Sequence, residues 1–446
     1  MRYVLIIILF FIIPSCLFSV EEILLISPED ARADIDTLLY SLNHIHATFK
    51  TYASTPKIVK RINSIKDSIQ APISSYDLFK ILQPIVAIDG HTSLVFRDKI
   101  TPDIQNAFFP IKICVFRNGM YVKKNVSDNN QIEQGMEIIA INGVPTERVT
   151  DKVLSFIPGE TRHYKLYKLQ NEFPFFYRLA YGNFLNFSIE LQAANKHIII
   201  SVPGVKAERV VPDSNNQLKI KFIDSNTAYL NIGKFKKPPV FLHNIDSLFT
   251  VLHDRKISYL IIDSRHGGGI TDLADSLVSY LTDKSFHSWQ QKAIKISDKT
   301  QTFINEIQST GSVEDGFFVI HPHDVKPPIR TNGFTGKFFL LTGPGTNSTA
   351  VYFAALLKCN QLATIVGQEC GQPLISNGNI ASFILPHSKI PVMSSNTIFR
   401  FPCAENSFDS VKPDYEVIPT LDDLLNDNDS ALNYTLKFIQ SSKQKE

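Results

Sequence analysis

The residues best suited to chemistry are a serine and a group of glycines, each placed after an apolar, strand-like run. Ser348 lies between the run 337–341 and a helical stretch that begins near Thr349. A serine at a helix N-terminus can present its Oγ as a nucleophile, and the Thr349 amide can point at an oxyanion developing beside it. The same residues also fit an ordinary N-cap by Asn347 or Ser348, and this stretch alone favours that interpretation.

The glycine group follows a second apolar run. Residues 258–263 form a buried-strand pattern that ends at Asp263, and Arg265 and the glycines 267–269 come next. Consecutive glycines let backbone amides approach a ligand without obstruction by side chains, although a flexible strand-to-helix turn would need them too. Both groups lie at the carboxyl ends of candidate parallel strands, where open α/β sheets bind ligands.

Motifs for common cofactors are absent from the sequence. It contains no HExxH motif, and no Lys-Ser/Thr pair follows the glycines at 343 and 345. His321 and His323 form only a weak candidate metal pair. We therefore expect neither a metal nor a cofactor.

The overall charge argues against a nucleic-acid partner. Lys and Arg number 45 and Asp and Glu 43, so the formal charge of +2 is close to neutral. Hydrophobic residues make up 44% and charged residues 20%, a globular balance that excludes wholesale disorder.

The N-terminus has the pattern of a secretory signal. Arg2 precedes an unbroken apolar run at 4–13, which is shorter than the roughly 20 residues of a membrane-spanning helix. Two processing routes are open: cleavage after Ser19, giving a signal peptide at 1–19, or a loose lipobox that makes Cys16 a lipid-anchored N-terminus. We expect an exported protein, periplasmic or associated with the cell envelope.

The cysteines of the mature chain leave two interpretations open. In an oxidising compartment, a pair among Cys114, Cys359, Cys370 and Cys403 can form a disulfide. The alternative is buried thiols, which we favour for Cys114 because it lies inside an apolar strand-like run.

Hydrophobic periodicity divides the chain into regions of different structure. Residues 20–95 predict helices that lead into Asp89-Gly90-His91-Thr92. Short alternating strands follow, with a tight turn at Asn142-Gly143. After residue 234, strands at 258–263, 337–341 and 363–366 alternate with helices at 273–281 and 350–358, which predicts an α/β layer. Residues 421–439 predict one final helix.

Taken together, these stretches resemble the carboxyl-terminal processing (tail-specific) serine peptidases and the related tricorn protease core. The resemblance rests on the order and spacing of the motifs along nearly the whole mature chain. It implies a multi-domain α/β protein: a helical region at 20–95, a PDZ-like β domain at 108–185, and a ClpP/crotonase-like catalytic core at 186–446.

The resemblance also implies roles for individual residues. Ser348 matches the nucleophile. His91 and Glu405 match the base and the orienting carboxylate of the tricorn-like branch, a trio in which imidazole takes the hydroxyl proton and the carboxylate holds the imidazole. The oxyanion hole would combine the amide of Thr349 with that of Gly267 or Gly268.

The sequence departs from the family pattern in three places. Many members use a downstream Lys as base, whereas residues 369–373 contain none. The turn at 265–269 is one residue shorter than the usual form, and Gly90 stands where the tricorn-like branch carries a Ser.

These features predict an exported serine endopeptidase that cleaves unfolded or C-terminal polypeptide segments. The PDZ-like segment would bind a peptide C-terminus by strand addition and gate the site, or would act as a spacer. The alternative is a catalytically inactive peptide-binding or scaffold protein of the same fold, with a carrier of hydrophobic ligands as a third hypothesis. The sequence does not indicate the oligomeric state.

Overall fold

The computed structural model describes residues 25–95, 106–194, 196–211, 218–235, 238–269, 272–288, 291–321, 324–405 and 409–444. The predicted signal at 1–19, with Cys16, and the candidate metal residue His323 lie outside these ranges. Within them, no helix combines the length and the apolarity that crossing a membrane requires. In the same part of the chain, no group of three or more His, Cys, Asp or Glu side chains is arranged to hold a metal ion.

The N-terminal region is helical, and its first helix begins where the sequence predicts. Ser27 Oγ accepts the Asp30 N–H at 3.1 Å and so caps the helix ahead of Pro28. The apolar faces of these helices share one core with the next region of the chain. The elements are β1 (Leu25–Ile26), α1 (Pro28–Ile45), α2 (Phe49–Ala53), α3 (Pro56–Ser68), β2 (Ile73–Ser74), α4 (Ser75–Val86) and β3 (Ser93–Leu94).

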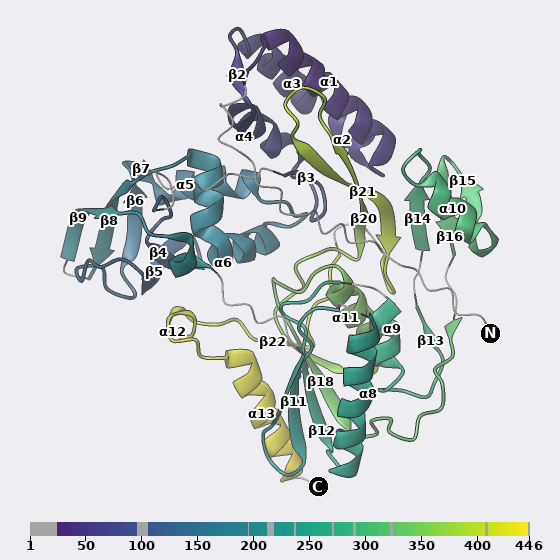
Figure 1. The fold of residues 1–446 in the computed structure, drawn as a ribbon. Helices are drawn as coiled ribbons and strands as arrows, with labels where there is room; N and C mark the ends of the chain where they lie inside the picture. Colours follow the sequence, from purple (N-terminus) through teal and green to yellow (C-terminus); the bar gives the residue numbers. More distant parts are fainter. Residues whose placement is uncertain are drawn as a thin grey trace.

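The next region is a sheet in the order β4-β5-β6-β8-β9, with α5 and α6 packed against it (Figure 1). Asn142 and Gly143 have φ values of 51° and 74°, so the predicted tight turn is confirmed. Its elements are β4 (Ile111–Phe116), β5 (Gly119–Asn125), β6 (Glu137–Ile141), β7 (Val144–Pro145), α5 (Thr146–Phe156), α6 (Arg162–Tyr181), β8 (Asn186–Ala193), β9 (Lys196–Pro203) and α7 (Ala207–Val210).

This sheet crosses the predicted domain boundary at 185/186. Strands β8 and β9, which the sequence analysis assigned to the catalytic core, pair with β6 and with each other. Alternation of apolar and polar residues identifies a strand but not its partner, because pairing is decided by tertiary packing. The boundary between the two parts therefore follows β9.

The predicted α/β layer is confirmed as a sheet in the order β10-β11-β12-β18-β19-β22, parallel from β11 onward. Leu260 and Ile262 of β12 pack with α8, α9 and α11, whereas Tyr259 and Ile261 pack with α13. Burial of both faces explains why these strands read as continuous apolar runs. The elements are β10 (Lys219–Phe222), β11 (Thr227–Asn231), α8 (Pro238–Asp254), β12 (Tyr259–Asp263), α9 (Asp272–Val278), β18 (Lys337–Thr342), α11 (Thr349–Cys359), β19 (Thr364–Gly367) and β22 (Tyr415–Glu416).

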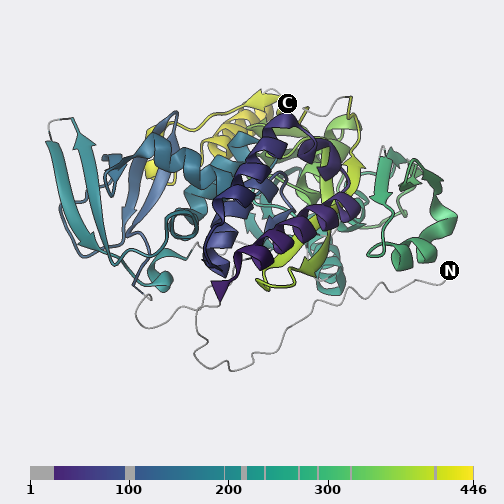
Figure 2. The same ribbon diagram turned by 90° about the horizontal axis from the view of Figure 1, so that it is seen from above.

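A third, antiparallel sheet connects this core to the N-terminal helices. The long hairpin β20–β21 rises from the core beside α1 and α2, and β21 pairs with β3 through Met393 and Ser93 (Figure 1). Viewed from above, β14–β16 and the β4–β9 sheet lie at opposite ends of the molecule (Figure 2). The elements are β13 (Phe286–His287), β14 (Gln291–Lys295), α10 (Gln301–Ile307), a 3₁₀ turn (Gln308–Thr310), β15 (Ser312–Glu314), β16 (Phe317–Ile320), β17 (Asp324–Val325), β20 (Ile375–Ile384) and β21 (Pro391–Arg400).

The predicted C-terminal helix at 421–439 is two helices, α12 (Leu421–Leu425) and α13 (Ser430–Lys443). Four consecutive Asn and Asp residues, 426–429, separate them. Such side chains compete for backbone hydrogen bonds and favour turns and caps over helix interiors. Accordingly, Asp427 has a φ of 53°, and Asp429 accepts the Leu432 N–H at 3.0 Å to cap α13.

Candidate active site

Ser348 occupies a strained turn between β18 and α11. Its φ of 53° and ψ of −127° are costly for a residue with a Cβ, and such strain is concentrated at functional sites. Ser348 holds the N-cap position, yet its side chain makes no capping hydrogen bond. The Ser348 side chain therefore does not cap α11, although this stretch of sequence alone favours an N-cap.

The glycine turn after β12 packs against the start of α11. A Cβ on Gly267 would lie 2.2 Å from the Ala350 Cβ, so only glycine allows this approach. The Thr349 hydroxyl also donates to Gly269 O at 2.6 Å. Gly267 N–H donates to Ser264 O at 3.2 Å, which commits that amide to the turn. Gly268 is thus the better candidate for a second oxyanion donor beside Thr349.

His91 lies in a turn that a buried carboxylate holds in place. Asp89 accepts hydrogen bonds from the His91 N–H (2.8 Å), the Ser395 hydroxyl (3.0 Å) and the Thr92 hydroxyl (3.1 Å), and its other contact is His46 Nε2 at 2.7 Å. The His46 contact and these hydrogen bonds outweigh burial and hold the pKa of Asp89 below its ordinary value. The turn that presents His91 is therefore rigid.

The imidazole of His91 is held in its neutral form. Burial lowers the pKa of His91, while the Asp89 charge and a hydrogen bond with the Asn377 backbone oppose that shift only in part. The His91 Nδ1 is buried and has no hydrogen-bond partner among the described residues. A neutral imidazole with an uncommitted nitrogen is what a general base requires.

Gln372 joins the surroundings of Ser348 to those of His91. Its Oε1 accepts the Ser348 N–H, and its Nε2 donates to Glu160 Oε1 at 3.2 Å. The other Glu160 oxygen accepts the Gly90 N–H at 3.2 Å, next to His91. Neither Glu160 nor Gln372 is predicted from the sequence as a site residue. The one available signal was the stretch 369–373, where a polar Gln stands in a segment without the expected Lys.

A short segment before and within the start of α6, residues 160–167, contacts the turns that carry Ser348, the glycines and His91. We call it the docking segment. Besides Glu160, it bonds to the 369–373 loop, the Ser348 turn, the glycine turn and the end of α4. These contacts are Thr161 Oγ1 to Gly371 O (2.5 Å), His163 Nε2 to Cys370 O (2.8 Å), Tyr164 Oη to the Asn347 amide (3.2 Å), Lys165 Nζ to Ala87 O (3.0 Å) and Tyr167 Oη to His266 Nδ1 (2.7 Å).

Comparison with known proteins agrees with this architecture. Residues 226–385 match the model of peptidase family S41. The chain carries an S41 peptidase domain. It is a serine-type peptidase whose substrates are polypeptides, and Ser348, both glycine candidates and Gln372 lie inside the matched range. His91, Glu160 and Glu405 lie outside it.

Solved structures share the fold of this chain at low sequence identity. Mature CPAF complexed with lactacystin has a TM-score of 0.68 at 14% identity, covering 94% of this chain and 98% of that one. Mature CPAF alone has a TM-score of 0.65 at 14% identity, covering 89% and 94%. A putative peptidase from Parabacteroides merdae has a TM-score of 0.50 at 15% identity, covering 93% and 96%. No curated protein matches the chain.

Glu405 is the predicted site residue that the structure leaves apart from the others. Its side chain is exposed, and within the described ranges no hydrogen bond or ion pair joins it to His91. It follows Cys403, which forms a disulfide with Cys359 at the end of α11. The disulfide alternative therefore holds for this pair, while Cys114 and Cys370 are buried thiols. The role of Glu405 stays a prediction.

The Asp263–Arg265 part of the motif is structural. Burial favours the neutral acid, but the Arg265 guanidinium holds the pKa of Asp263 below its ordinary value. Arg265 also bonds both oxygens of Asp429 at 2.8 and 2.7 Å, which ties the glycine turn to the start of α13.

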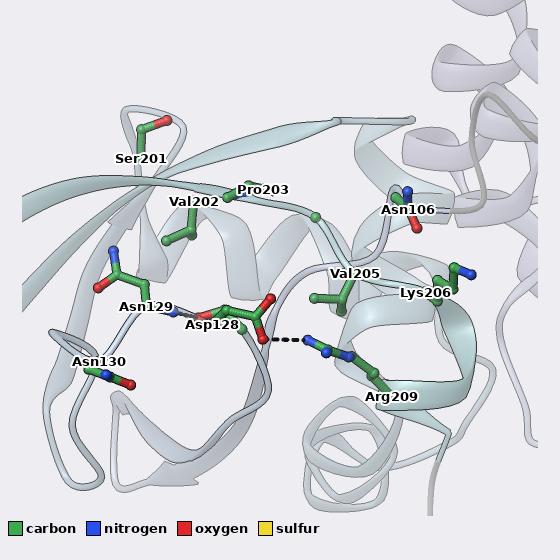
Figure 3. Close-up of a pocket in the computed structure, with 12 residues that line it drawn as sticks. Asn106, Asp128, Asn129, Asn130, Ser201, Val202, Pro203, Val205, Lys206 and Arg209 are labelled. Atoms are coloured by element: carbon green, nitrogen blue, oxygen red, sulfur yellow. Dashed lines mark hydrogen bonds and ion pairs between the residues drawn. The ribbon is translucent and has the colours of Figure 1, made fainter.

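A separate cavity of about 800 Å³ lies at the end of the β4–β9 sheet (Figure 3). Asp128 and Arg209 form an ion pair of 3.1 Å across it. Its lining includes none of the candidate catalytic residues and no residue bonded to them. It therefore does not belong to the site around Ser348.

Proposed function

We propose that this chain is an exported serine endopeptidase in which Ser348 is the nucleophile and His91 the general base. The observation that carries the proposal is the backbone of Ser348, which is strained and leaves the hydroxyl without a capping role at the N-terminus of α11. A residue is held in such a conformation only when the surrounding structure over-determines it.

In the proposed reaction, Ser348 Oγ attacks the scissile carbonyl carbon as its proton passes to the neutral His91 ring. The carbonyl π electrons move to oxygen, and the amides of Thr349 and Gly268 stabilise the resulting oxyanion. The C–N bond then breaks, and His91 gives its proton to the leaving amine. Water releases the acyl group by the same steps in reverse order. Glu405 is proposed to orient His91 when the substrate is bound.

Export is proposed on two grounds. The N-terminal sequence has the pattern of a secretory signal, and the Cys359–Cys403 disulfide is typical of oxidising compartments. Mass spectrometry of the mature N-terminus distinguishes cleavage after Ser19 from lipidation at Cys16. An uncleaved N-terminus in protein recovered from the cytoplasm would contradict export.

Covalent labelling tests the catalytic assignment. A fluorophosphonate probe should label the mature wild-type protein, and labelling should be lost in Ser348→Ala and in His91→Ala. Ser441→Ala, an exposed serine on α13, is the matched control and should label normally. Lactacystin, the compound bound to mature CPAF, should compete with the probe. Peptide binding without labelling or turnover would instead support the inactive, peptide-binding alternative.

A further inference from the structure

A partly buried line of hydrogen bonds connects the nucleophile turn to the base turn. It runs from the Ser348 N–H to Gln372 Oε1, from Gln372 Nε2 to Glu160 Oε1, and from the Gly90 N–H to Glu160 Oε2. Gln372 is only 2% exposed. The residues at its two ends, Ser348 and Gly90, belong to the core and to the N-terminal region, respectively.

The donors and acceptors along this line fix the chemical identity of its members. The Ser348 N–H requires an acceptor, so the Gln372 amide oxygen must face it and the Gln372 nitrogen must face Glu160. Glu160 then receives one N–H on each of its two oxygens. An ionised carboxylate accepts at both oxygens. A protonated carboxyl group accepts at its carbonyl oxygen and, more weakly, at its hydroxyl oxygen, whereas an amide has an acceptor at one position only.

Several titratable groups surround Glu160. Burial, with a smaller effect from the Asp89 charge, raises the pKa of Glu160 to about 8. Burial and, to a smaller extent, the Glu160 charge raise the pKa of Tyr164 in the docking segment. Burial lowers the pKa of Lys165, which the Glu160 charge opposes in part. Glu160 is therefore a neutral acid at pH 7. Above about pH 8, it becomes a second buried negative charge beside Asp89, close to His91.

We propose that Glu160 and Gln372 are positioning residues of the peptidase, which hold the backbone of Ser348 and the Gly90–His91 turn in one fixed relative arrangement without touching the substrate. The inference rests on the proposed function of Ser348 and His91. It identifies the docking segment, outside the matched S41 range, as part of the catalytic apparatus.

Probe kinetics with Glu160→Gln provide the first test. This variant keeps the size of the side chain and removes one acceptor. The rate of Ser348 labelling and kcat should fall about 100-fold with little change in KM, because a small misplacement of reacting groups costs about that much. Glu133→Gln, which breaks an exposed ion pair with Lys196, is the matched control and should behave as wild type. The wild-type labelling rate should also decrease above about pH 8, and the labelling rate of Glu160→Gln should not show this decrease.

Hydrogen–deuterium exchange provides a second test that does not depend on activity. In Glu160→Gln, exchange should accelerate both in peptides covering 88–92 and in peptides covering 343–352, although the second set does not contact residue 160. If Glu160→Gln does not fold, Gln372→Ala serves the same purpose and should accelerate exchange in both sets.

Two results would overturn the inference: wild-type labelling kinetics in Glu160→Gln, or faster exchange at 88–92 with none at 343–352. Failure of the proposed function looks different. In that case Ser348→Ala would keep the labelling or hydrolysis of the wild type, while the exchange experiment would still decide whether the two turns are coupled.

Discussion

The backbone N–H of Ser348 donates its hydrogen bond to the side chain of Gln372, 24 positions along the chain. Gln372 lies in the segment where many relatives are expected to carry a catalytic Lys. The side-chain amide of glutamine neither gains nor loses a proton in the physiological pH range, so it cannot replace Lys as a base. What it supplies here is an acceptor for the backbone N–H of the strained turn, and in the proposed mechanism His91 carries out the proton transfer.

Gly267→Ala should disrupt the approach of the glycine turn to α11. The added Cβ would lie 2.2 Å from Ala350 Cβ and 3.2 Å from Ser264 O, so the turn must move away from Thr349. We expect a loss of about 1–3 kcal/mol in the free energy of unfolding and a strong loss of Ser348 labelling. Chemical denaturation and probe kinetics measure the two effects.

The double variant Gly267→Ala/Ala350→Gly is the control for that steric argument. Removing the Ala350 methyl restores the space, at a cost of about 1 kcal/mol for a glycine in a helix. Partial recovery of labelling is expected. No recovery, with the protein fully folded, would mean that the backbone freedom of Gly267 matters rather than its size.

The stability of the protein should depend on pH through Glu160. Its pKa of about 8 lies above its ordinary value of 4.5, so the folded protein keeps a proton that the unfolded chain has already lost. The free energy of unfolding should therefore decrease as pH rises between these two values, by up to about 1.4 kcal/mol per pH unit from this group. Urea denaturation at pH 5.5, 7 and 8.5 should show a smaller decrease in Glu160→Gln than in the wild type.

Sequence patterns predicted the elements around the nucleophile well, because those elements are local. The strand ending at Asp263, the strand before Gly343 and the helix after Ser348 all appear within one or two residues of their predicted ends. Burial on both faces of the sheet leaves a strong apolar signal in the sequence. Close packing requires glycine at 267 and 269, whereas Gly268 has a φ of 147° that favours glycine.

Glu160 and Gln372 could not be predicted, because their importance arises from contacts between distant parts of the chain. Glu160 is 70 positions from Gly90 and 212 from Gln372. A glutamate shortly before a helix looks like a solvated or helix-capping residue in the sequence. Only the packing of the docking segment onto the core buries it. The same limitation placed β8 and β9 in the wrong domain, since the residues of a strand do not specify which strand it pairs with.

The Cys359–Cys403 disulfide should stabilise the fold and hold the segment before Glu405 to the end of α11. It closes a loop of 44 residues, for which the chain-entropy model gives about 4 kcal/mol. Cys359→Ser/Cys403→Ser should therefore have a lower Tm, and a reductant should lower the Tm of the wild type but not of the double variant. Cys114→Ser, at a buried free thiol, provides the comparison, because its response to reductant should equal that of the wild type.

Glu405→Gln tests whether this carboxylate acts on His91. If Glu405 orients the His91 ring when a peptide docks, removing its charge should lower kcat by a factor of about 100 or more. The Tm of the free protein, in which the Glu405 side chain is exposed, should change little. Glu416→Gln, another exposed acid in β22, is the control. Equal peptide hydrolysis by the Glu405→Gln variant and the wild type would mean that the backbone at Asn377 and the Asp89 turn orient His91 by themselves. The catalytic unit would then be Ser348 and His91, with Glu160 and Gln372 holding them together.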